Sequence, residues 1–153
     1  MLAEKLNKKF IDIDEFIIQE TGKDAADHLE QLGDEKFLEF EASVVKKINI
    51  SDAIISSSGS VPLKKDGIDH LKKNSITVWM DIPLEIIEQR VGARHDGDSR
   101  IVGASSMTLE EIFAWRKKSY QENHDFRFYI TQEAEKEKNL EKLFSFLKEN
   151  DLC

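Results

Sequence analysis

Four short apolar runs, rich in β-branched and aromatic residues, divide the chain, and each has the length and composition of a buried β-strand. Between and after these runs, apolar residues recur every three or four positions, which is typical of amphipathic helices. We expect strands at residues 10–13, 53–56, 76–80 and 126–130, and helices at residues 34–48, 84–91, from 108 onward, and 138–148. Strands that alternate with helices indicate βαβ units, so the pattern predicts an α/β fold with a parallel sheet and flanking helices.

The helix expected from residue 108 carries a local start signal. Thr108 and Glu111 have the spacing of a capping box, in which the threonine side chain accepts a hydrogen bond from the backbone N–H three residues later. The glutamate side chain accepts one in return from the N–H of the first residue. We therefore expect this helix to begin directly after Thr108.

Composition and charge narrow the functional classes. The 153 residues contain 30 Asp and Glu against 22 Lys and Arg, a formal net charge of −8, which argues against nucleic-acid backbone binding. No apolar run approaches the roughly 18 residues of a membrane span, so we expect no membrane partner. The single cysteine, Cys153, allows no internal disulfide and indicates a reducing, cytoplasmic setting. With no internal repeat or linker, we expect one domain over residues 1–153, and a monomer.

Residues 92–107 do not fit a regular element. They contain three glycines and the two arginines Arg94 and Arg100, with little periodicity. Long polar loops are usually disordered or functional, and a lid over a phosphate site needs mobile cations. The segment therefore predicts a lid from about residue 93 to residue 107.

An ordered series of short motifs resembles the shikimate kinases, a family of small-molecule kinases with a P-loop. The order and spacing agree over nearly the whole chain. The segments that carry the resemblance are Phe10–Asp14 with Thr21–Lys23, Gly33–Glu41, Ile54–Ser60, Trp79–Pro83 with Arg90, Arg100–Gly103 and Trp115–Glu122. The resemblance implies ATP-dependent phosphorylation of a hydroxyl of shikimate or a similar small hydroxy acid, in the chorismate route to aromatic amino acids.

On the acceptor side, the resemblance assigns roles to four residues. Asp12 would hold Mg²⁺ through water, and Asp14 would bind the substrate hydroxyls and take or orient the proton. The two acids are expected two apart at the end of a parallel strand, where α/β ligand sites lie. Gly59 would belong to the turn against the substrate ring, and Arg116 would bind the substrate carboxylate. The alternatives are that one acid caps the following helix and that Arg116 belongs to a solvated face.

On the nucleotide side, the resemblance implies ATP and Mg²⁺ as cofactors. Arg100 would stabilise the transferring charge, and Arg94 would stack on the adenine base. The alternative for both arginines is a surface cation without a ligand.

The phosphate-binding loop of the family is missing from the sequence. The motif G-x-x-x-x-G-K-[ST] presents backbone N–H groups and a lysine to the phosphates. Residues 92–99 match its glycine spacing, but Asp98 stands in place of the lysine. We therefore expect no useful kinase turnover from residues 1–153, and we interpret the sequence as a truncated reading or, second, as a natural remnant.

The central strand that precedes the P-loop in these kinases is also missing. Its absence predicts open inner edges on the strands at 53–56 and 76–80. The alternatives are that these two strands pair directly or that something else fills the gap.

At three positions the sequence departs from the family pattern in a way that changes the expected acceptor. Leu38 replaces a second carboxylate-binding arginine, and Ser58 and Ser60 replace two glycines of the turn. We then expect another small polyol or acid as the acceptor, and the alternative is a degenerate site. The rival hypothesis is a non-catalytic small-molecule-binding or interaction module, and a third is a relative of the nucleoside monophosphate kinases.

Overall fold

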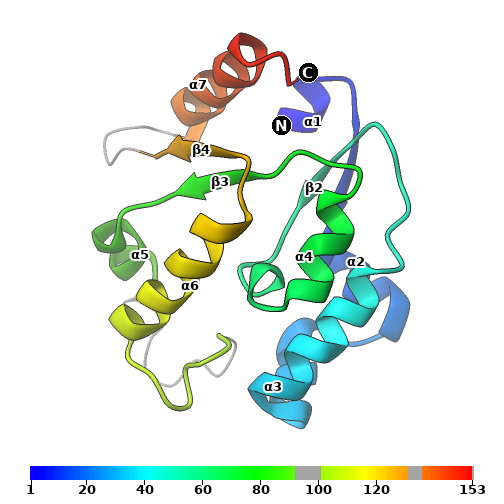
Figure 1. The fold of residues 1–153 in the computed structure, drawn as a ribbon, viewed down its shortest axis with the longest axis vertical. Helices are drawn as coiled ribbons and strands as arrows, with labels where there is room; N and C mark the ends of the chain where they lie inside the picture. The colour runs from blue at the N-terminus through cyan, green and yellow to red at the C-terminus, as the bar shows by residue number, and fades with distance from the viewer. Residues whose placement is uncertain (92–100, 131–135, 153) are drawn as a thin grey trace.

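The computed structural model describes residues 1–91, 101–130 and 136–152, and it confirms the α/β organisation (Figure 1). The elements in chain order are α1 (Leu2–Lys5), β1 (Lys9–Asp12), α2 (Ile13–Thr21), α3 (Ala25–Val45), β2 (Ala53–Ser56), the 3₁₀ turn η1 (Val61–Leu63), α4 (Lys65–Lys72), β3 (Val78–Asp81), α5 (Leu84–Val91), α6 (Leu109–Asn123), β4 (Phe126–Tyr129) and α7 (Lys136–Glu149). All the expected strands form, within one or two residues of their predicted bounds.

The helices differ from the expected list, which did not include the short helices α1 and α2. Helix α3 begins at Ala25, nine residues before the predicted start, and it bends at Gly33, whose φ of 73° breaks the regular geometry. Helix α4 was not predicted at all, because its short sequence is mostly polar and contains Gly67. That glycine allows α4 to approach α3 closely, since a Cβ there would lie 3.3 Å from the Cα of Ala42.

The strands form two separate two-stranded parallel sheets. Strand β1 pairs with β2, with Ile11 opposite Ile55, and β3 pairs with β4, with Met80 opposite Phe128. Strands β2 and β3 do not pair with each other in the described part of the chain. The alternative in which these two strands pair directly is therefore wrong, and the expectation of open inner edges is confirmed.

Each sheet has its own packing partners. On the β1–β2 side, Ile13 and Ile17 of α2 pack with Val44 and Val45 of α3 and with Val61 of η1, all at most 2% exposed. On the β3–β4 side, Phe126 and Phe128 lie edge-on to Phe146 of α7, with ring centroids 6.1 and 5.5 Å away. The two sheets are thus stabilised by different helices.

The described part of the predicted lid packs on α3. Val102 is 2% exposed and forms a second buried cluster with Leu29 and Phe37. Gly103 has a φ of +97°, and a Cβ there would lie 3.3 Å from Ile112. Residues 101–107 therefore form a fixed base, while residues 93–100 of the predicted lid lie outside the described residues.

The start of α6 is as predicted. The hydroxyl of Thr108 accepts a hydrogen bond from the N–H of Glu111, and the Glu111 carboxylate accepts one from the N–H of Thr108. This reciprocal pair confirms the capping box.

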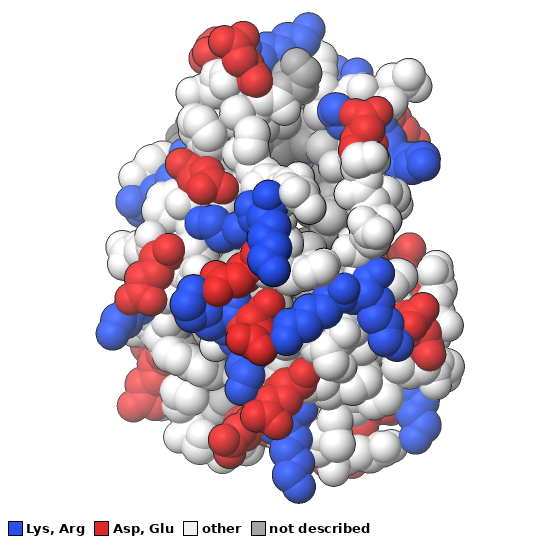
Figure 2. Space-filling model, turned by 45° about the vertical axis from the view of Figure 1, so that its right-hand side comes forward, with Lys and Arg blue, Asp and Glu red and all other residues white. Residues whose placement is uncertain are grey.

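Charges on the surface are mixed. Figure 2 shows lysine, arginine, aspartate and glutamate side chains interspersed over the face it draws. Ion pairs Lys46–Asp66 and Lys64–Glu39 connect α3 with α4 and the residue before it, at 2.8 and 3.2 Å. Such exposed pairs contribute little stability. Among the described residues, no helix has the length and apolar composition needed to cross a membrane.

The core on the β1–β2 side gives a stability prediction. Ile17 is 0% exposed, whereas its neighbour Ile18 on α2 is 46% exposed. Ile17→Ala should lower the free energy of unfolding by about 2–5 kcal/mol, because it removes buried methyl groups and leaves a cavity. Ile18→Ala is the matched control and should change it by at most about 0.5 kcal/mol. Urea unfolding monitored by circular dichroism compares the two, and equal losses would contradict this packing.

Candidate functional site

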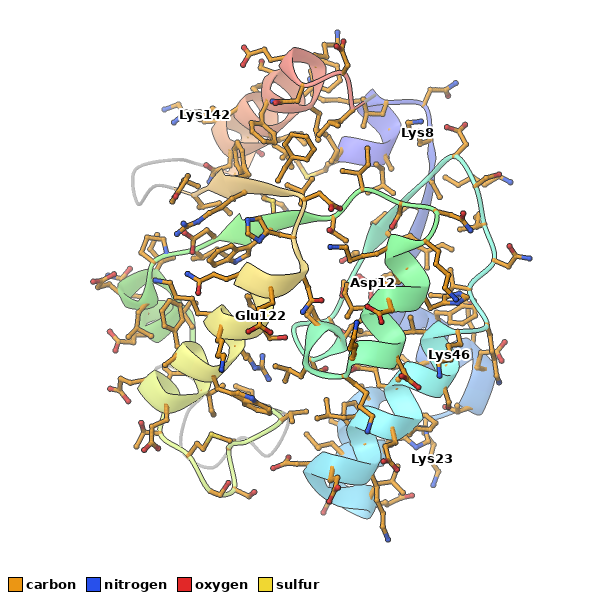
Figure 3. All side chains as sticks on the ribbon, in the orientation of Figure 1. Lys8, Asp12, Lys23, Lys46, Glu122 and Lys142 are labelled. Carbon is orange, nitrogen blue, oxygen red and sulfur yellow. The ribbon has the colours of Figure 1, made fainter. Side chains whose placement is uncertain are left out.

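Asp12 ends β1 and caps α2. One oxygen of its carboxylate accepts hydrogen bonds from the N–H groups of Asp14 and Glu15, at 2.9 and 3.4 Å. The expectation that Asp12 and Asp14 share a strand end is therefore wrong, because the helix begins at Ile13 and places Asp14 in its first turn. The capping alternative is confirmed for Asp12. Asp12 is one of the side chains labelled in Figure 3.

Asp14 still lies beside the other polar groups. Partial burial raises the pKa of its carboxyl, and the neighbouring Asp12 carboxylate raises it further. A carboxylate whose pKa is raised takes a proton more readily near neutral pH.

Glu41 of α3 is buried next to the turn that follows β2. Its side chain is 1% exposed, and its Oε1 accepts hydrogen bonds from Ser58 Oγ at 2.5 Å and Ser60 Oγ at 2.7 Å. Its Oε2 is buried without a hydrogen-bond partner among the described residues. Burial raises the pKa of Glu41 and the Asp14 charge adds to the rise, while both serines and Arg116 oppose it.

Gly59 brings the same turn against α6. The Tyr120 hydroxyl donates to the Gly59 carbonyl at 2.7 Å. A Cβ on Gly59 would lie 2.9 Å from Arg116 Nη1 and 3.0 Å from the Tyr120 hydroxyl, so this close approach requires glycine. The structure thus brings the predicted residues Gly59 and Arg116 together.

Arg116 is held at the centre of this arrangement. Its Nη2 donates to the Val102 carbonyl at 3.4 Å, and its Nε is buried without a partner among the described residues. Partial burial raises the pKa of the Tyr120 hydroxyl, and Arg116 opposes this rise. A wholly solvated position for Arg116 is therefore excluded.

These groups converge from four parts of the fold. We call them the Glu41–Arg116 cluster: Asp14 of α2, Glu41 of α3, Ser58, Gly59 and Ser60 after β2, and Arg116 and Tyr120 of α6. The cluster offers a buried acceptor, Glu41 Oε2, and a buried donor, Arg116 Nε, that no described residue satisfies. A ligand that carries both a hydroxyl and an acceptor group such as a carboxylate would satisfy both.

The residues expected to bind Mg²⁺ and ATP are only partly within the described residues. Arg94 and Arg100 lie outside the described residues. Within the described ranges, no group of three or more His, Cys, Asp or Glu side chains could hold a metal ion, so Asp12 supplies a single carboxylate. The given sequence contains no match to the phosphate-binding motif G-x-x-x-x-G-K-[ST].

Glu41 was missed as a site residue by the sequence analysis. It stood within the motif Gly33–Glu41, but nothing in its helical pattern distinguishes a buried carboxylate from a solvated one. The signal that could have found it is the pair of serines that replace glycines at positions 58 and 60, because hydroxyls in a buried turn need acceptors.

The comparison with known sequences decides the family. A sequence model described as "Shikimate kinase" matches residues 1–148. The chain belongs to the shikimate kinase family. The "Shikimate kinase" of Sulfurihydrogenibium sp. is 31% identical over 122 residues, which cover 79% of this chain and 72% of that protein. The resemblance inferred from the motifs is thereby confirmed.

Other relatives are much longer than this chain. "Threonine synthase-like 1" of Homo sapiens is 31% identical over 150 residues, which cover 97% of this chain but 20% of that protein. The chain thus spans about a fifth of the length of these relatives.

Solved shikimate kinase structures share the fold. The enzyme from Acinetobacter baumannii, solved in complex with shikimate, aligns over 99% of this chain and 85% of its own, with a TM-score of 0.79 and 22% identity. The enzyme from Aquifex aeolicus aligns over 99% and 88%, with a TM-score of 0.76 and 23% identity. The P-loop-kinase-like α/β architecture expected from the motifs is confirmed.

The buried carboxyl gives a pH-dependent prediction. Because the pKa of Glu41 is raised in the folded chain, this group contributes stability below its ordinary pKa and loses it as the pH rises through the folded pKa. The free energy of unfolding of Glu41→Gln should therefore fall less between about pH 5 and pH 8 than that of the parent chain. Urea unfolding at both pH values measures the difference.

The control is Glu39→Gln, an exposed glutamate on the same helix that pairs with Lys64. This variant should change stability by less than about 1 kcal/mol at either pH. Parallel profiles for Glu41→Gln and the parent chain would show that Glu41 titrates alike in the folded and unfolded states.

Proposed function

We propose that residues 1–153 form the acceptor-binding part of a shikimate-kinase-like protein. The parent reaction is ATP-dependent phosphorylation of a hydroxyl of shikimate or a similar small hydroxy acid, in the cytoplasm. The observation that carries this proposal is a pair of buried groups at the turn around Gly59, Glu41 Oε2 and Arg116 Nε, which no described residue satisfies. A hydroxy acid complements both.

Three residues of the cluster have distinct tasks in this proposal. Arg116 binds the ligand carboxylate through its planar guanidinium. Glu41 Oε2 accepts a hydrogen bond from a ligand hydroxyl, and Asp14 orients the reacting hydroxyl and takes its proton. The raised pKa of Asp14 supports this last role, because it brings proton affinity nearer to neutral pH.

The acceptor differs in detail from that of the family. Leu38 packs with the buried cluster of Leu29, Phe37 and Val102, so its position supplies apolar surface where the family pattern has an arginine. Ser58 and Ser60 add hydroxyls, and both donate to Glu41. We infer an acceptor with several hydroxyls that relies on one arginine rather than two.

Phosphoryl transfer lies outside what residues 1–153 provide. In the parent reaction, ATP with Mg²⁺ supplies the phosphoryl group. The proposed residues for binding the metal and the nucleotide remain Asp12, Arg94 and Arg100. Since the P-loop is absent from the sequence, we propose that these residues bind the acceptor without turning it over.

The second candidate is a non-catalytic binding or interaction module. The observation that favours it is the match to "Threonine synthase-like 1", in which a region similar to almost this whole chain makes up a fifth of a longer protein. Such a module would keep the acceptor-binding residues, or only the scaffold, and it would use no nucleotide.

Ligand binding to the cluster can be tested by thermal shift. Shikimate at a hundredfold excess over its dissociation constant should stabilise the chain by about 2.7 kcal/mol, whereas Mg·ATP should not shift the melting temperature. Arg116→Lys removes the planar donor set and should weaken binding at least about tenfold. Lys118→Gln, on the exposed face of the same helix, should leave binding unchanged.

A shift with Mg·ATP alone would contradict the assignment of residues 1–153 to the acceptor side. A shift with a nucleoside monophosphate and none with shikimate would point to a nucleoside monophosphate kinase relative instead.

Turnover gives an independent test. Purified residues 1–153 with shikimate and Mg·ATP should form no phosphorylated product above the level of an Asp14→Asn control, because nothing in the sequence cradles the phosphates. Product detection by mass spectrometry measures this. Turnover that Asp14→Asn abolishes would overturn the claim of inactivity and would place Asp14 in catalysis.

A further inference from the structure

Tyr120 of α6 connects the turn after β2 with the β3–β4 sheet. Its hydroxyl donates to the Gly59 carbonyl at 2.7 Å, and its ring packs against the indole of Trp79 in β3, with ring centroids 6.1 Å apart. Figure 1 shows α6 passing below β3 and beside η1. The place of the Gly59 carbonyl therefore depends on where the Trp79 ring holds Tyr120.

The Trp79 ring is itself held from β4. Arg127, the residue paired with Trp79 across the two strands, has its guanidinium carbon 4.5 Å from the Trp79 ring centroid. Its Nε and Nη2 donate to the Asp81 carboxylate at 2.9 and 2.5 Å, and its guanidinium also lies over the Tyr129 ring at 4.3 Å. Cation–π contact and charge-assisted hydrogen bonds thus restrict how the indole can turn.

His124 contacts both members of the Trp79–Tyr120 pair. Its ring lies edge-on to Trp79, with centroids 5.4 Å apart, and its Nδ1 lies 2.9 Å from the Tyr120 carbonyl oxygen. A carbonyl oxygen can only accept, so Nδ1 carries the proton and donates. The indole is therefore in contact with two side chains of α6 and with one of β4.

The other face of the same sheet packs independently of Tyr120. Phe126 and Phe128 alternate with Arg127 along β4, so they point to the opposite face, where they contact Phe146 of α7. Loss of the Phe146 ring should therefore weaken the sheet without changing the contacts of Trp79. Phe146 is thus the matched control for Trp79.

We propose that Trp79 is a positioning residue of the Glu41–Arg116 cluster. It acts through Tyr120, whose hydroxyl holds the Gly59 carbonyl and so fixes the turn that carries two serine hydroxyls to Glu41. The expected effect on acceptor binding rests on the proposed function. The expected effect on the turn needs no ligand, so the two can fail separately.

Amide order parameters from ¹⁵N relaxation test the turn in the ligand-free chain. In the parent chain, the N–H groups of Gly59 and Ser60 should give values near the rigid limit of about 0.85. Trp79→Leu, which removes the ring, and Tyr120→Phe, which removes only the hydroxyl, should each lower them below about 0.6. Trp79→Phe should restore the rigid turn, because it keeps a ring against Tyr120.

The control variant Phe146→Leu should lower the melting temperature and leave both order parameters unchanged. Trp79→Met is the second variant in case Trp79→Leu does not fold, since its flexible side chain fills more of the vacated space. A rigid turn in folded Trp79→Leu or Trp79→Met would overturn the proposal. An equally mobile turn in Phe146→Leu would overturn it as well.

Isothermal titration with shikimate tests the effect on binding. Trp79→Leu and Tyr120→Phe should each weaken binding by about threefold to tenfold, the effect of one hydrogen bond. The double variant should bind no more weakly than either single one, because Trp79 acts through Tyr120. Additive losses would show that Trp79 acts by another route and would contradict the proposal. If shikimate does not bind the parent chain, the proposed function fails, and the order parameters still decide the role of Trp79.

Discussion

Glu41 of α3 is 1% exposed and lies against the turn after β2. The side chains packed around it must offset the cost of burying its carboxylate. Burying a carboxylate is expensive unless hydrogen bonds and an opposite charge offset the cost. Here the hydroxyls of Ser58 and Ser60 donate hydrogen bonds to one carboxylate oxygen. Arg116 of α6 lowers the pKa of Glu41 and so favours its charged form. The arrangement ties α3 to the turn, and the turn to α6 through Gly59.

The second constraint is the separation of the two sheets. Without a shared ladder, they are connected through α4 and α6 and the segments beside them. The Lys72 ammonium donates to the Asn123 carbonyl at 3.2 Å, the Thr77 hydroxyl donates to the same carbonyl at 3.0 Å, and the Ser119 hydroxyl donates to the Pro62 carbonyl. These contacts connect the two sheets, which share no strand pairing within the described residues.

The chemistry of the Glu41–Arg116 cluster follows from the same packing. Leu38 is an apolar side chain that packs against the buried cluster of Phe37 and Val102, so this position adds no positive charge to the site. Arg116 is then the one arginine among the described groups of the cluster, and its orientation is set by the Val102 carbonyl and by contact with Gly59. In the proposed binding of a hydroxy acid, Leu38 stands where the family pattern has a second arginine, and Ser58 and Ser60 stand where it has glycines.

Much of the fold was determined by local sequence. The strands follow from short β-branched runs, the start of α6 from the Thr108–Glu111 pair, and the family from motifs whose order is a property of the sequence. These features depend on neighbours within a few residues, or on spacing alone, so they can be deduced without coordinates.

The arrangement of the Glu41–Arg116 cluster was decided only by tertiary structure. Sequence spacing placed Asp12 and Asp14 on one strand, but burial of Ile13 starts the helix there and turns Asp12 into its cap. The buried atoms Glu41 Oε2 and Arg116 Nε, which find no hydrogen-bond partner in the described part of the chain, lie where α3, α6 and the turn after β2 meet. Burial of a charge is a property of what packs over it, and no local pattern along the chain records that.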